Sequence, residues 1–577
     1  MRVRGGDPQF VLAATVACAA AGHQAVVLID APSARAANQR FCDAYAPARF
    51  VTLTTPGDLA ALEPKSRGEV VCGSSDPRLR LAAAALAVAA QARVRFDGEI
   101  RHEVQLLSAG TSPPRRLTDE AAILELAADL QSERGPIDTL VLVNPHDSGL
   151  SHLAPLAMTG RRAALLLTNA AGTNAGELLR AAAERRGFAH VEHVMILGSP
   201  EAIPPERRPN PHAGKDSEID MEPGTPAGDE PHTWSIGRLF HRDPAMVALT
   251  LAQSRLLPPD GAPRTALVAS NPGESLPMLE AFSRTSAREL ESCGYATTAL
   301  FGDNLNGDEL RRRLPDADVI LWEGHHNTLI RDWGFSSWTE PLRPALFILQ
   351  SCLALTEDKA TPLFDRGALA VIGSSSRIYS ATGGAFSLAC LDAILHERET
   401  LGGSVRSAKN FLTAYGRLKQ QRLSEVRFGG ANQRSAWAFT LWGDPTLRLP
   451  APALADGPSQ RVRCDVHRDT IIVRAPAARQ SLRSESFVAP FRPNGRLAGL
   501  VRSDERGDKR LASLAFAEVP LPQAPPHGRP IIHTRFAESN WVFLWDSRRR
   551  AGWLLAVLPP EAERDIRFRI EWTSHDG

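Results

Sequence analysis

A histidine and a cysteine each follow a short apolar run in the middle of the chain. The run DVILWEG ends just before His325, and the run ALFILQ ends two residues before Cys352. Both runs are rich in Val, Ile, Leu and Phe, as strands buried on both faces are. In open α/β sheets, reactive groups gather just beyond the carboxyl ends of such strands. The spacing therefore predicts that His325 and Cys352 lie at one edge of a sheet.

The two residue types suit chemistry at a carbonyl carbon. A free thiol is mostly protonated at neutral pH, whereas the thiolate is the nucleophile. A neighbouring imidazole can accept the thiol proton or stabilise the thiolate as an imidazolium. Backbone N–H groups near the two strand ends can then stabilise the oxyanion that forms on the attacked carbonyl.

Five short motifs, in this order, resemble those of the gingipain-type cysteine peptidases, a bacterial family with the caspase-like fold. They are WSIGRL (234–239), Gly324-His325-His326, Ser351-Cys352, GALAVIGSS (367–375) and GDPTLRL (443–449). The similarity extends over roughly residues 135–450. This resemblance implies a cysteine-type endopeptidase in which Cys352 is the nucleophile and His325 is the general base.

The resemblance also predicts residues that face the substrate. His326 stands where the family has a second Gly, and its backbone N–H is expected at the oxyanion hole. Ser374, Ser375 and Arg377 follow the third apolar run and are expected to border the substrate pocket. A polar turn explains the two serines equally well. If Arg377 faces the pocket, it favours an acidic substrate side chain.

Composition restricts the possible functions. The chain has 577 residues, is 43% hydrophobic and has a net charge of +1, as expected for a globular protein of several domains that does not bind nucleic acid. Its seven scattered cysteines predict neither a disulfide framework nor a zinc site, and no cofactor is expected. No apolar run reaches the roughly 20 residues of a membrane span. The dominance of Arg over Lys suggests a bacterial source with a GC-rich genome.

The N-terminus allows two interpretations. Arg2 and Arg4 precede an apolar stretch that resembles a weak secretory signal, which would send the protein to the periplasm or the medium. Asp7-Pro8 instead starts a helix over residues 8–21 that leads into a strand over 25–30. The helix is the favoured interpretation, and it implies a cytoplasmic protein.

The chain divides into four predicted units. They are an α/β domain (1–115), an α/β subdomain (116–262), a caspase-like catalytic domain (263–450) and a β-sandwich of immunoglobulin-like type (461–577). The fold class is thus α/β, with doubly wound sheets followed by a β-sandwich-like domain. Within the second unit, residues 201–233 are rich in Pro, Gly and acidic residues and are predicted to be a solvated loop; a cation site is the alternative.

Three functions compete. The first is a cysteine endopeptidase acting on a protein or peptide. The second is a catalytically silent caspase-like module that binds a partner; it is favoured by His326 and by the absence of a Gly shortly after Cys352, where Leu353 follows. The third is a nucleotide- or sugar-binding protein, but residues 73–77 lack the features of a phosphate-binding loop. The sequence predicts no oligomeric state.

Overall fold

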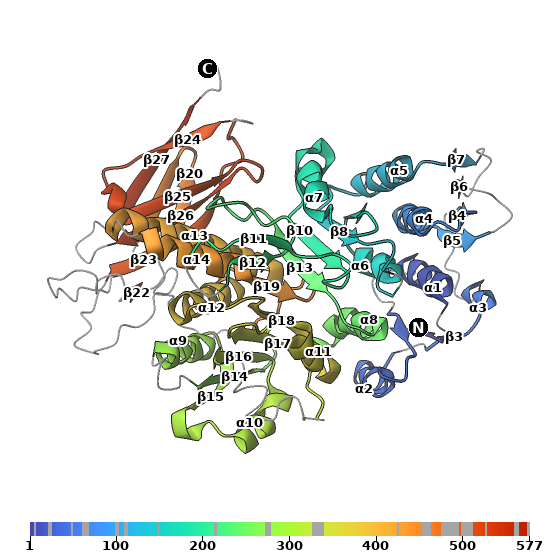
Figure 1. Ribbon diagram of the computed structural model, residues 1–577, viewed down its shortest axis with the longest axis horizontal. Helices are drawn as coiled ribbons and strands as arrows, with labels where there is room; N and C mark the ends of the chain where they lie inside the picture. The colour runs from blue at the N-terminus through green and yellow to red at the C-terminus, as the bar shows by residue number, and fades with distance from the viewer. Residues whose placement is uncertain are drawn as a thin grey trace.

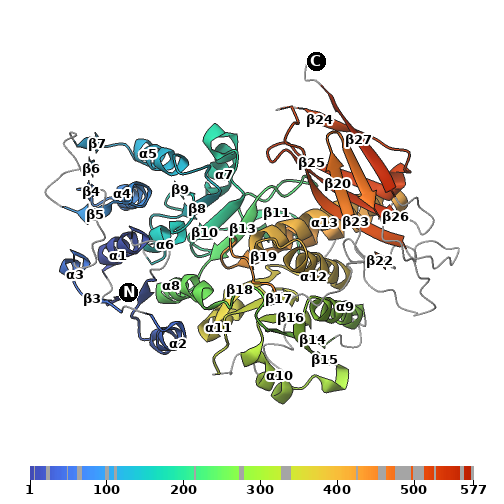
Figure 2. The same ribbon diagram turned by 180° about the vertical axis from the view of Figure 1, so that it is seen from behind.

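The structure of the protein is a computed structural model with three regions of different architecture (Figure 1). Small sheets and helices lie at the N-terminal end, a large sheet lies in the middle, and antiparallel sheets lie at the C-terminal end (Figures 1 and 2). The structure describes residues 1–4, 7–20, 26–47, 50–60, 68–97, 103–108, 114–147, 149–212, 216–271, 278–325, 340–423, 426–452, 463–474, 496–497, 512–525, 528–558 and 565–573.

The central sheet has the strand order β15-β14-β16-β17-β18-β19-β13-β10-β8-β9. Its strands are β8 (Thr139–Val143), β9 (Ala163–Leu167), β10 (His193–Leu197), β13 (Ser235–Leu239), β14 (Arg264–Asn271), β15 (Tyr295–Phe301), β16 (Val319–Gly324), β17 (Ala345–Gln350), β18 (Ala368–Ser374) and β19 (Phe439–Trp442). Neighbours are parallel except β18 and β19, which are antiparallel. The sheet therefore consists of two parallel halves whose carboxyl ends lie at opposite edges.

The predicted α/β class is confirmed by this sheet and the helices that cover it. The helices are α6 (Ala154–Met158), α7 (Ala175–Glu184), α8 (Pro244–Gln253), α9 (Met278–Ser292), α10 (Gly307–Arg313), α11 (Glu357–Arg366), α12 (Ser380–Leu395), α13 (Leu401–Leu423) and α14 (Val426–Ala438). Strands from the predicted units 116–262 and 263–450 pair within this one sheet. The boundaries of the units stay a prediction.

Strand β16 shows why the apolar runs are continuous. Val319 and Leu321 pack with residues of α9, α12 and α13, whereas Ile320 and Trp322 pack with residues of α8 and α11 on the other face. All six residues of β16 are buried. Successive side chains of a strand point to opposite faces, so a strand covered on both faces needs apolar residues at nearly every position.

The N-terminal region holds two small sheets, with strand orders β2-β1-β3 and β5-β4-β6-β7. Its elements are β1 (Arg2–Val3), α1 (Pro8–Ala20), β2 (Leu28–Ile29), α2 (Arg35–Tyr45), β3 (Thr52–Leu53), α3 (Pro56–Ala60), β4 (Gly68–Cys72), α4 (Pro77–Ala90), β5 (Arg93–Phe96), β6 (Val104–Ser108), β7 (Arg115–Leu117) and α5 (Glu120–Ser132). The helix predicted over 8–21 is confirmed as α1. Helix α4 is capped by the Asp76 carboxylate, which accepts a hydrogen bond from the N–H of Arg78. The turn at 73–77 is thus an ordinary strand-to-helix turn.

The solvated loop predicted over 201–233 is wrong in part. Strands β11 (Glu206–Pro209) and β12 (Glu218–Met221) form an antiparallel hairpin, and Ile219 and Met221 are fully buried. Glu222 is also buried, in an ion pair with Arg238 of β13. The acidic composition predicts exposure to solvent. It gives no sign of these contacts, because the partners are distant in sequence. No group of three or more potential metal-ligating side chains occurs in the described ranges.

The predicted C-terminal β-structure is confirmed as two antiparallel sheets, with strand orders β20-β21-β27-β24 and β22-β23-β26-β25. Their strands are β20 (Arg463–His467), β21 (Thr470–Arg474), β22 (Arg496–Leu497), β23 (Ala512–Pro520), β24 (Arg529–His533), β25 (Trp541–Asp546), β26 (Ala551–Leu558) and β27 (Asp565–Thr573). Leu554 and Phe568 are buried between the sheets. Phe516 stacks on Trp553 and meets Phe411 of α13 edge-on, so this region docks on the central one. None of the helices in the described ranges has the length and apolar content that a membrane span requires.

Gly384 tests the packing of α12 against α9. A Cβ at this position would lie 2.4 Å from Cγ of Phe282, a buried ring on α9. An Ala ordinarily stabilises a helix by about 1 kcal/mol relative to Gly, so destabilisation by Gly384→Ala must come from this contact. We expect a cost of about 1–3 kcal/mol, measured as a lower midpoint of thermal unfolding. Gly187→Ala is the control, since no atom lies within 4 Å of its Cβ; equal midpoints in the two variants would contradict the packing.

Candidate active site

The two candidate catalytic residues follow neighbouring parallel strands at matched positions. In the pairing of β16 with β17, Glu323 lies opposite Gln350. Continued by two residues, the same register sets His325 opposite Cys352. Neighbouring strands lie about 4.8 Å apart, so this register brings the two positions to the same edge of the sheet. His325 is exposed to solvent and Cys352 is half-buried.

A buried hydrogen bond ties the two strand ends together. The hydroxyl of Ser351 donates to the carbonyl of Gly324, and Ser351 is only 3% exposed. These residues immediately precede Cys352 and His325. The bond supports the continued register, because it joins the backbone directly before the histidine to the side chain directly before the cysteine.

The sulfur of Cys352 lies against the main chain that follows β18. The N–H of Ile378 donates to Sγ at 3.4 Å, and Sγ lies 3.5 Å from the carbonyl oxygen of the same residue. A thiol can donate to the carbonyl, and a thiolate can accept from the N–H. No described residue accepts a hydrogen bond from the backbone N–H of Cys352 itself. That N–H is therefore a free donor next to the sulfur.

Leu353 adopts a backbone conformation that usually belongs to glycine. Its φ is 53°, in the left-handed region, which costs an L-residue roughly 1–2 kcal/mol. The turn is held by the N–H of Leu353, which donates to the carbonyl of Ser376, and by the N–H of Leu355, which donates to that of Ser374. The sequence lacks a Gly after Cys352, and the structure shows that Leu tolerates the turn because two cross-strand bonds maintain it.

The serines at the end of β18 are engaged in the turn itself. Ser374 is fully buried, and its hydroxyl donates to the carbonyl of Ser376 at 2.7 Å. The hydroxyl of Ser375 lies 3.1 Å from the carbonyl oxygens of both Asp220 and Ala438. These contacts fit the polar-turn alternative; whether either serine also meets a substrate stays a prediction. His326 lies outside the described residues.

Arg377 shares one carboxylate with a second arginine. Its Nη1 lies 3.3 Å from Oδ1 of Asp216, and Arg434 donates to the other oxygen of the same carboxylate. Arg434 is buried and also donates from Nε to the carbonyl of Arg377 at 2.9 Å. The side chain of Arg377 is 51% exposed. Two guanidinium groups thus face a single carboxylate beside the strand-end cysteine.

Glu323 is not a partner of the histidine imidazole but a buried acid beneath the site. It is 0% exposed, and the hydroxyl of Ser283 donates to its Oε2 at 2.8 Å. Its Oε1 has no hydrogen-bond partner among the described residues. Burial raises the pKa of the Glu323 carboxyl to about 8, so the group is mostly protonated at neutral pH.

Other polar strand ends lie away from the cysteine. Asn144 follows β8, and its amide donates to two backbone carbonyls, those of Ala170 and Ala202. Asp444 follows β19, where it accepts from the N–H of Thr446 and pairs with Arg161. Both positions are at the opposite edge of the sheet because β18 and β19 are antiparallel. The closing GDP motif therefore fixes a turn, as its residue types predict.

Sequence analysis did not predict three contributors to this edge: Asp216, the N–H of Ile378 and Arg434. A backbone N–H carries no residue-type signal. Asp216 and Arg434 are separated by 218 residues, and only the folded chain brings them together. An acidic residue in a charged stretch and an arginine on a helix gave no pattern that could have found them.

Comparison with known families identifies the region around the cysteine. Residues 336–450 match the family model for peptidase family C25. The matched range contains β17, Cys352, β18 and β19, and it begins after His325. Residues 336–450 thus match a family of cysteine-type peptidases. That family is C25, the gingipain type, and the resemblance predicted from the sequence motifs is confirmed over this range.

Solved structures of gingipains are among those similar to this chain. The Arg-specific cysteine proteinase gingipain R (RgpB) is 11% identical over 76% of this chain and 92% of its own, with a TM-score of 0.42. The complex of Porphyromonas gingivalis RgpB pro- and mature domains is 12% identical over 75% and 93%, with a TM-score of 0.41. A Saccharomyces cerevisiae separase–securin complex covers 36% of this chain and 14% of its own at 12% identity, with a TM-score of 0.28. These TM-scores are low, so the family assignment depends on the match over 336–450. Comparison with curated protein sequences gave no match.

The protonated carboxyl of Glu323 predicts a stability that depends on pH. In the unfolded chain this carboxyl ionises near pH 4.3, whereas in the folded chain it keeps its proton up to about pH 8. Between these values the folded state binds more protons, so the stability falls as the pH rises. We expect a loss of roughly 3 kcal/mol from pH 5 to pH 7 through this group, since each pKa unit is worth about 1.4 kcal/mol.

Glu323→Gln should remove this dependence while keeping an oxygen that accepts from Ser283. Thermal unfolding midpoints measured from pH 5 to pH 8 should fall less steeply in this variant than in the wild type. The control is Glu309→Gln, because Glu309 is a surface carboxylate whose pKa is lowered by hydrogen bonds from Arg312 and Arg313. Parallel pH profiles for wild type and Glu323→Gln would show that the carboxyl is ionised in the folded chain.

Proposed function

We propose that the protein hydrolyses peptide bonds as a cysteine endopeptidase, with Cys352 as nucleophile and His325 as general base. The observation that carries the proposal is the register of β16 and β17, in which the same offset that pairs Glu323 with Gln350 sets His325 opposite Cys352. The buried bond from Ser351 to Gly324 supports that register. The family match over 336–450 supports a peptidase.

The chemistry proceeds in two steps. His325 takes the thiol proton, the thiolate of Cys352 forms a bond to the carbonyl carbon, and the bond to the leaving nitrogen breaks as the imidazolium returns a proton to it. A water molecule, deprotonated by His325, then hydrolyses the thioester and releases the acid. The N–H of Ile378 lowers the cost of the thiolate, since it already donates to Sγ.

The oxyanion needs donors beside the sulfur. The backbone N–H of Cys352 has no acceptor in the described part of the chain, which makes it one candidate. The N–H of His326 is the second candidate, as the resemblance implies. Each such donor is worth about 2.7–4 kcal/mol in the transition state. Both donors are backbone groups, so the side chain at 326 does not remove its own donor.

A catalytically silent binding module is the alternative. It is favoured by His326 and by the absence of a Gly shortly after Cys352, where Leu353 adopts the left-handed region. The two functions differ in the reactivity of the Cys352 thiol toward an electrophilic peptide. A peptide with an acyloxymethyl ketone warhead should label Cys352 of an active enzyme and leave the thiol of a silent module unmodified, which mass spectrometry would report.

Cys352→Ala should abolish cleavage of a peptide library without unfolding the protein, because the lost volume is small and the group is half-buried. His325→Ala should lower kcat by about 10²–10⁴-fold, the usual contribution of a general base. His326→Ala is the matched control and should cost less. Activity retained in Cys352→Ala would remove the proposed nucleophile, and a larger loss in His326→Ala would reassign the base.

We infer further that Arg377 selects an acidic side chain next to the scissile bond. Arg377 directly precedes Ile378, whose N–H meets the sulfur. Its contact with Asp216 is half-exposed, and exposed ion pairs contribute only about 0–1 kcal/mol. Buried Arg434 keeps the Asp216 carboxylate paired when Arg377 turns to a substrate. When Arg377 exchanges Asp216 for an acidic substrate side chain, each of the charged groups therefore still has a partner of opposite charge.

Arg377→Ala should lower kcat/KM for peptides with Glu beside the scissile bond by about 10–100-fold and leave the Gln analogues nearly unchanged. That range corresponds to the loss of a hydrogen bond between charged groups. Arg207→Ala is the control. Arg207 forms an exposed ion pair with Asp220 across the β11–β12 hairpin, next to the segment that holds Asp216. A parallel loss for Glu and Gln peptides would reject a role of Arg377 in selectivity.

A further inference from the structure

A small cavity lies between the segment 224–236, helix α13 and strand β19. Its volume is about 10 Å³. A space of this size holds one water-sized particle, and a halide ion fits if the side chains around it move apart by a few tenths of an ångström. The polar groups that line it include Arg406, Lys409 and His232, and Trp234 forms part of its wall. Two basic residues thus line one buried space, and Cys352 is not among the residues that line it.

Lys409 has no partner for its ammonium group in the described part of the chain. The residue is only 6% exposed, and no hydrogen bond or ion pair of Nζ is present there. Glu222 is the carboxylate that acts on its charge, but Glu222 is already held by Arg238 through two hydrogen bonds of 2.9 and 2.6 Å. Burial lowers the pKa of Lys409 to about 8, so the group is still mostly protonated at neutral pH.

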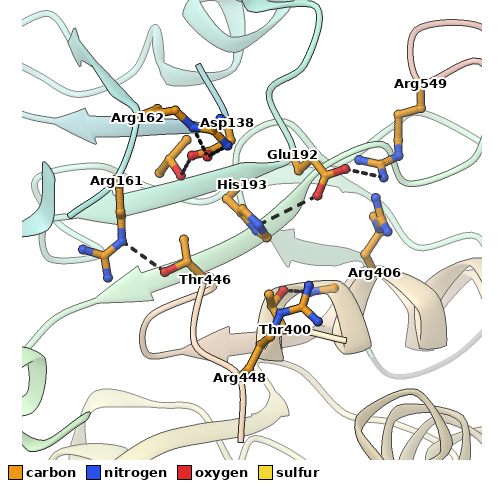
Figure 3. Close-up of polar contacts among 12 residues, drawn as sticks. Asp138, Arg161, Arg162, Glu192, His193, Thr400, Arg406, Thr446, Arg448 and Arg549 are labelled. Atoms are coloured by element: carbon orange, nitrogen blue, oxygen red, sulfur yellow. Dashed lines mark hydrogen bonds and ion pairs between the residues drawn. The ribbon is translucent and has the colours of Figure 1, made fainter. Parts of the chain in front are cut away.

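Arg406 is the second buried cation at the cavity. Its side chain is 3% exposed, and only Nη2 has an acceptor, a carboxylate oxygen of Glu518 at 2.9 Å. Nε and Nη1 are buried without a hydrogen-bond partner among the described residues, and the guanidinium carbon lies 5.5 Å from the centre of the Trp553 ring. Figure 3 shows Arg406 extending from α13 toward Glu192 and Arg549. Arg549 pairs with Glu518 and with Glu192, so Glu518 is shared between two arginines.

The charges around the cavity do not balance. The cations Lys409, Arg406, Arg549 and Arg238 are opposed by three carboxylates, Glu222, Glu518 and Glu192. The pair Arg208–Glu206 adds no net charge, and neither does Arg548 with Asp546. Burial lowers the pKa of both His232 and His193, which keeps these rings neutral at neutral pH. One positive charge is left without compensation, at high cost in a buried environment.

We propose that the cavity holds one small monovalent anion, chloride in ordinary buffers, bound between Lys409 Nζ and the unpartnered edge of Arg406. A monovalent anion cancels the single surplus charge, whereas a water molecule accepts hydrogen bonds and leaves the charge in place. The site joins α13 to the segment 224–236. Through Arg406 and Glu518 it also reaches the C-terminal sheets, so the anion stabilises the docking of that region.

Bromide replaces chloride in such sites and can be located by its anomalous scattering. We expect crystals of the full chain grown in sodium bromide to show an anomalous peak in the cavity, within contact distance of Nζ of Lys409. A cavity without such a peak, or one that holds only a water molecule, would overturn the proposal. This measurement uses the wild-type protein, so it does not depend on whether a variant folds.

Thermal unfolding in solution provides the second test. At equal ionic strength, the unfolding midpoint of the wild type should be about 2–4 °C higher in sodium chloride than in sodium gluconate, and the rise should saturate. Lys409→Met should lose this difference. Lys359→Met is the control, because Lys359 donates to the carbonyl of Leu353 outside the cavity, and it should keep the difference. Equal midpoints of the wild type in the two salts would overturn the proposal.

Discussion

The parallel register of β16 against β17 is the constraint on which the site depends. Both strands are buried along their whole length, so a slip of one residue would turn Trp322 and its neighbours to the wrong face. The hydroxyl of Ser351 fixes the same register at the strand ends through the carbonyl of Gly324. The two strands end at the same edge of the sheet, so the register alone brings the positions of the proposed dyad to that edge.

The antiparallel pair β18–β19 determines which strands end at the same edge of the sheet as Cys352. It divides the sheet into two halves, and the carboxyl ends of β14, β15, β16, β17 and β18 lie at the edge of the cysteine. The polar residues that follow the other half, such as Asn144 and Asp444, bind their own backbone or a neighbouring arginine instead. The closing GDP motif therefore serves the fold at one edge, whereas the proposed catalytic residues lie at the other.

The sequence could predict most of the sheet, because continuous apolar runs are a strong signal for strands covered on both faces. It could not predict α11, which carries a Pro at 362 and several charges, or the hairpin β11–β12, whose buried Ile219 is surrounded by acidic residues. The positions of His325 and Cys352 followed from the runs that precede them. The environment of Arg377 did not, since Asp216 and Arg434 come from distant parts of the chain.

The segment 201–233, which its composition predicts to be a solvated loop, in fact packs against the region of the candidate site. Its Asp216 pairs with Arg377 and Arg434, the carbonyl of Asp220 contacts the hydroxyl of Ser375, and its Glu222 neutralises the buried Arg238. These contacts join the hairpin region to the chain after β18, to helix α14 and to β13. The acidic residues are consequently structural ligands of arginines, and the abundance of Arg in this protein has a counterpart in buried carboxylates. The surplus charge at Lys409 arises in the same network, where Glu222, the carboxylate that acts on Lys409, is already paired with Arg238.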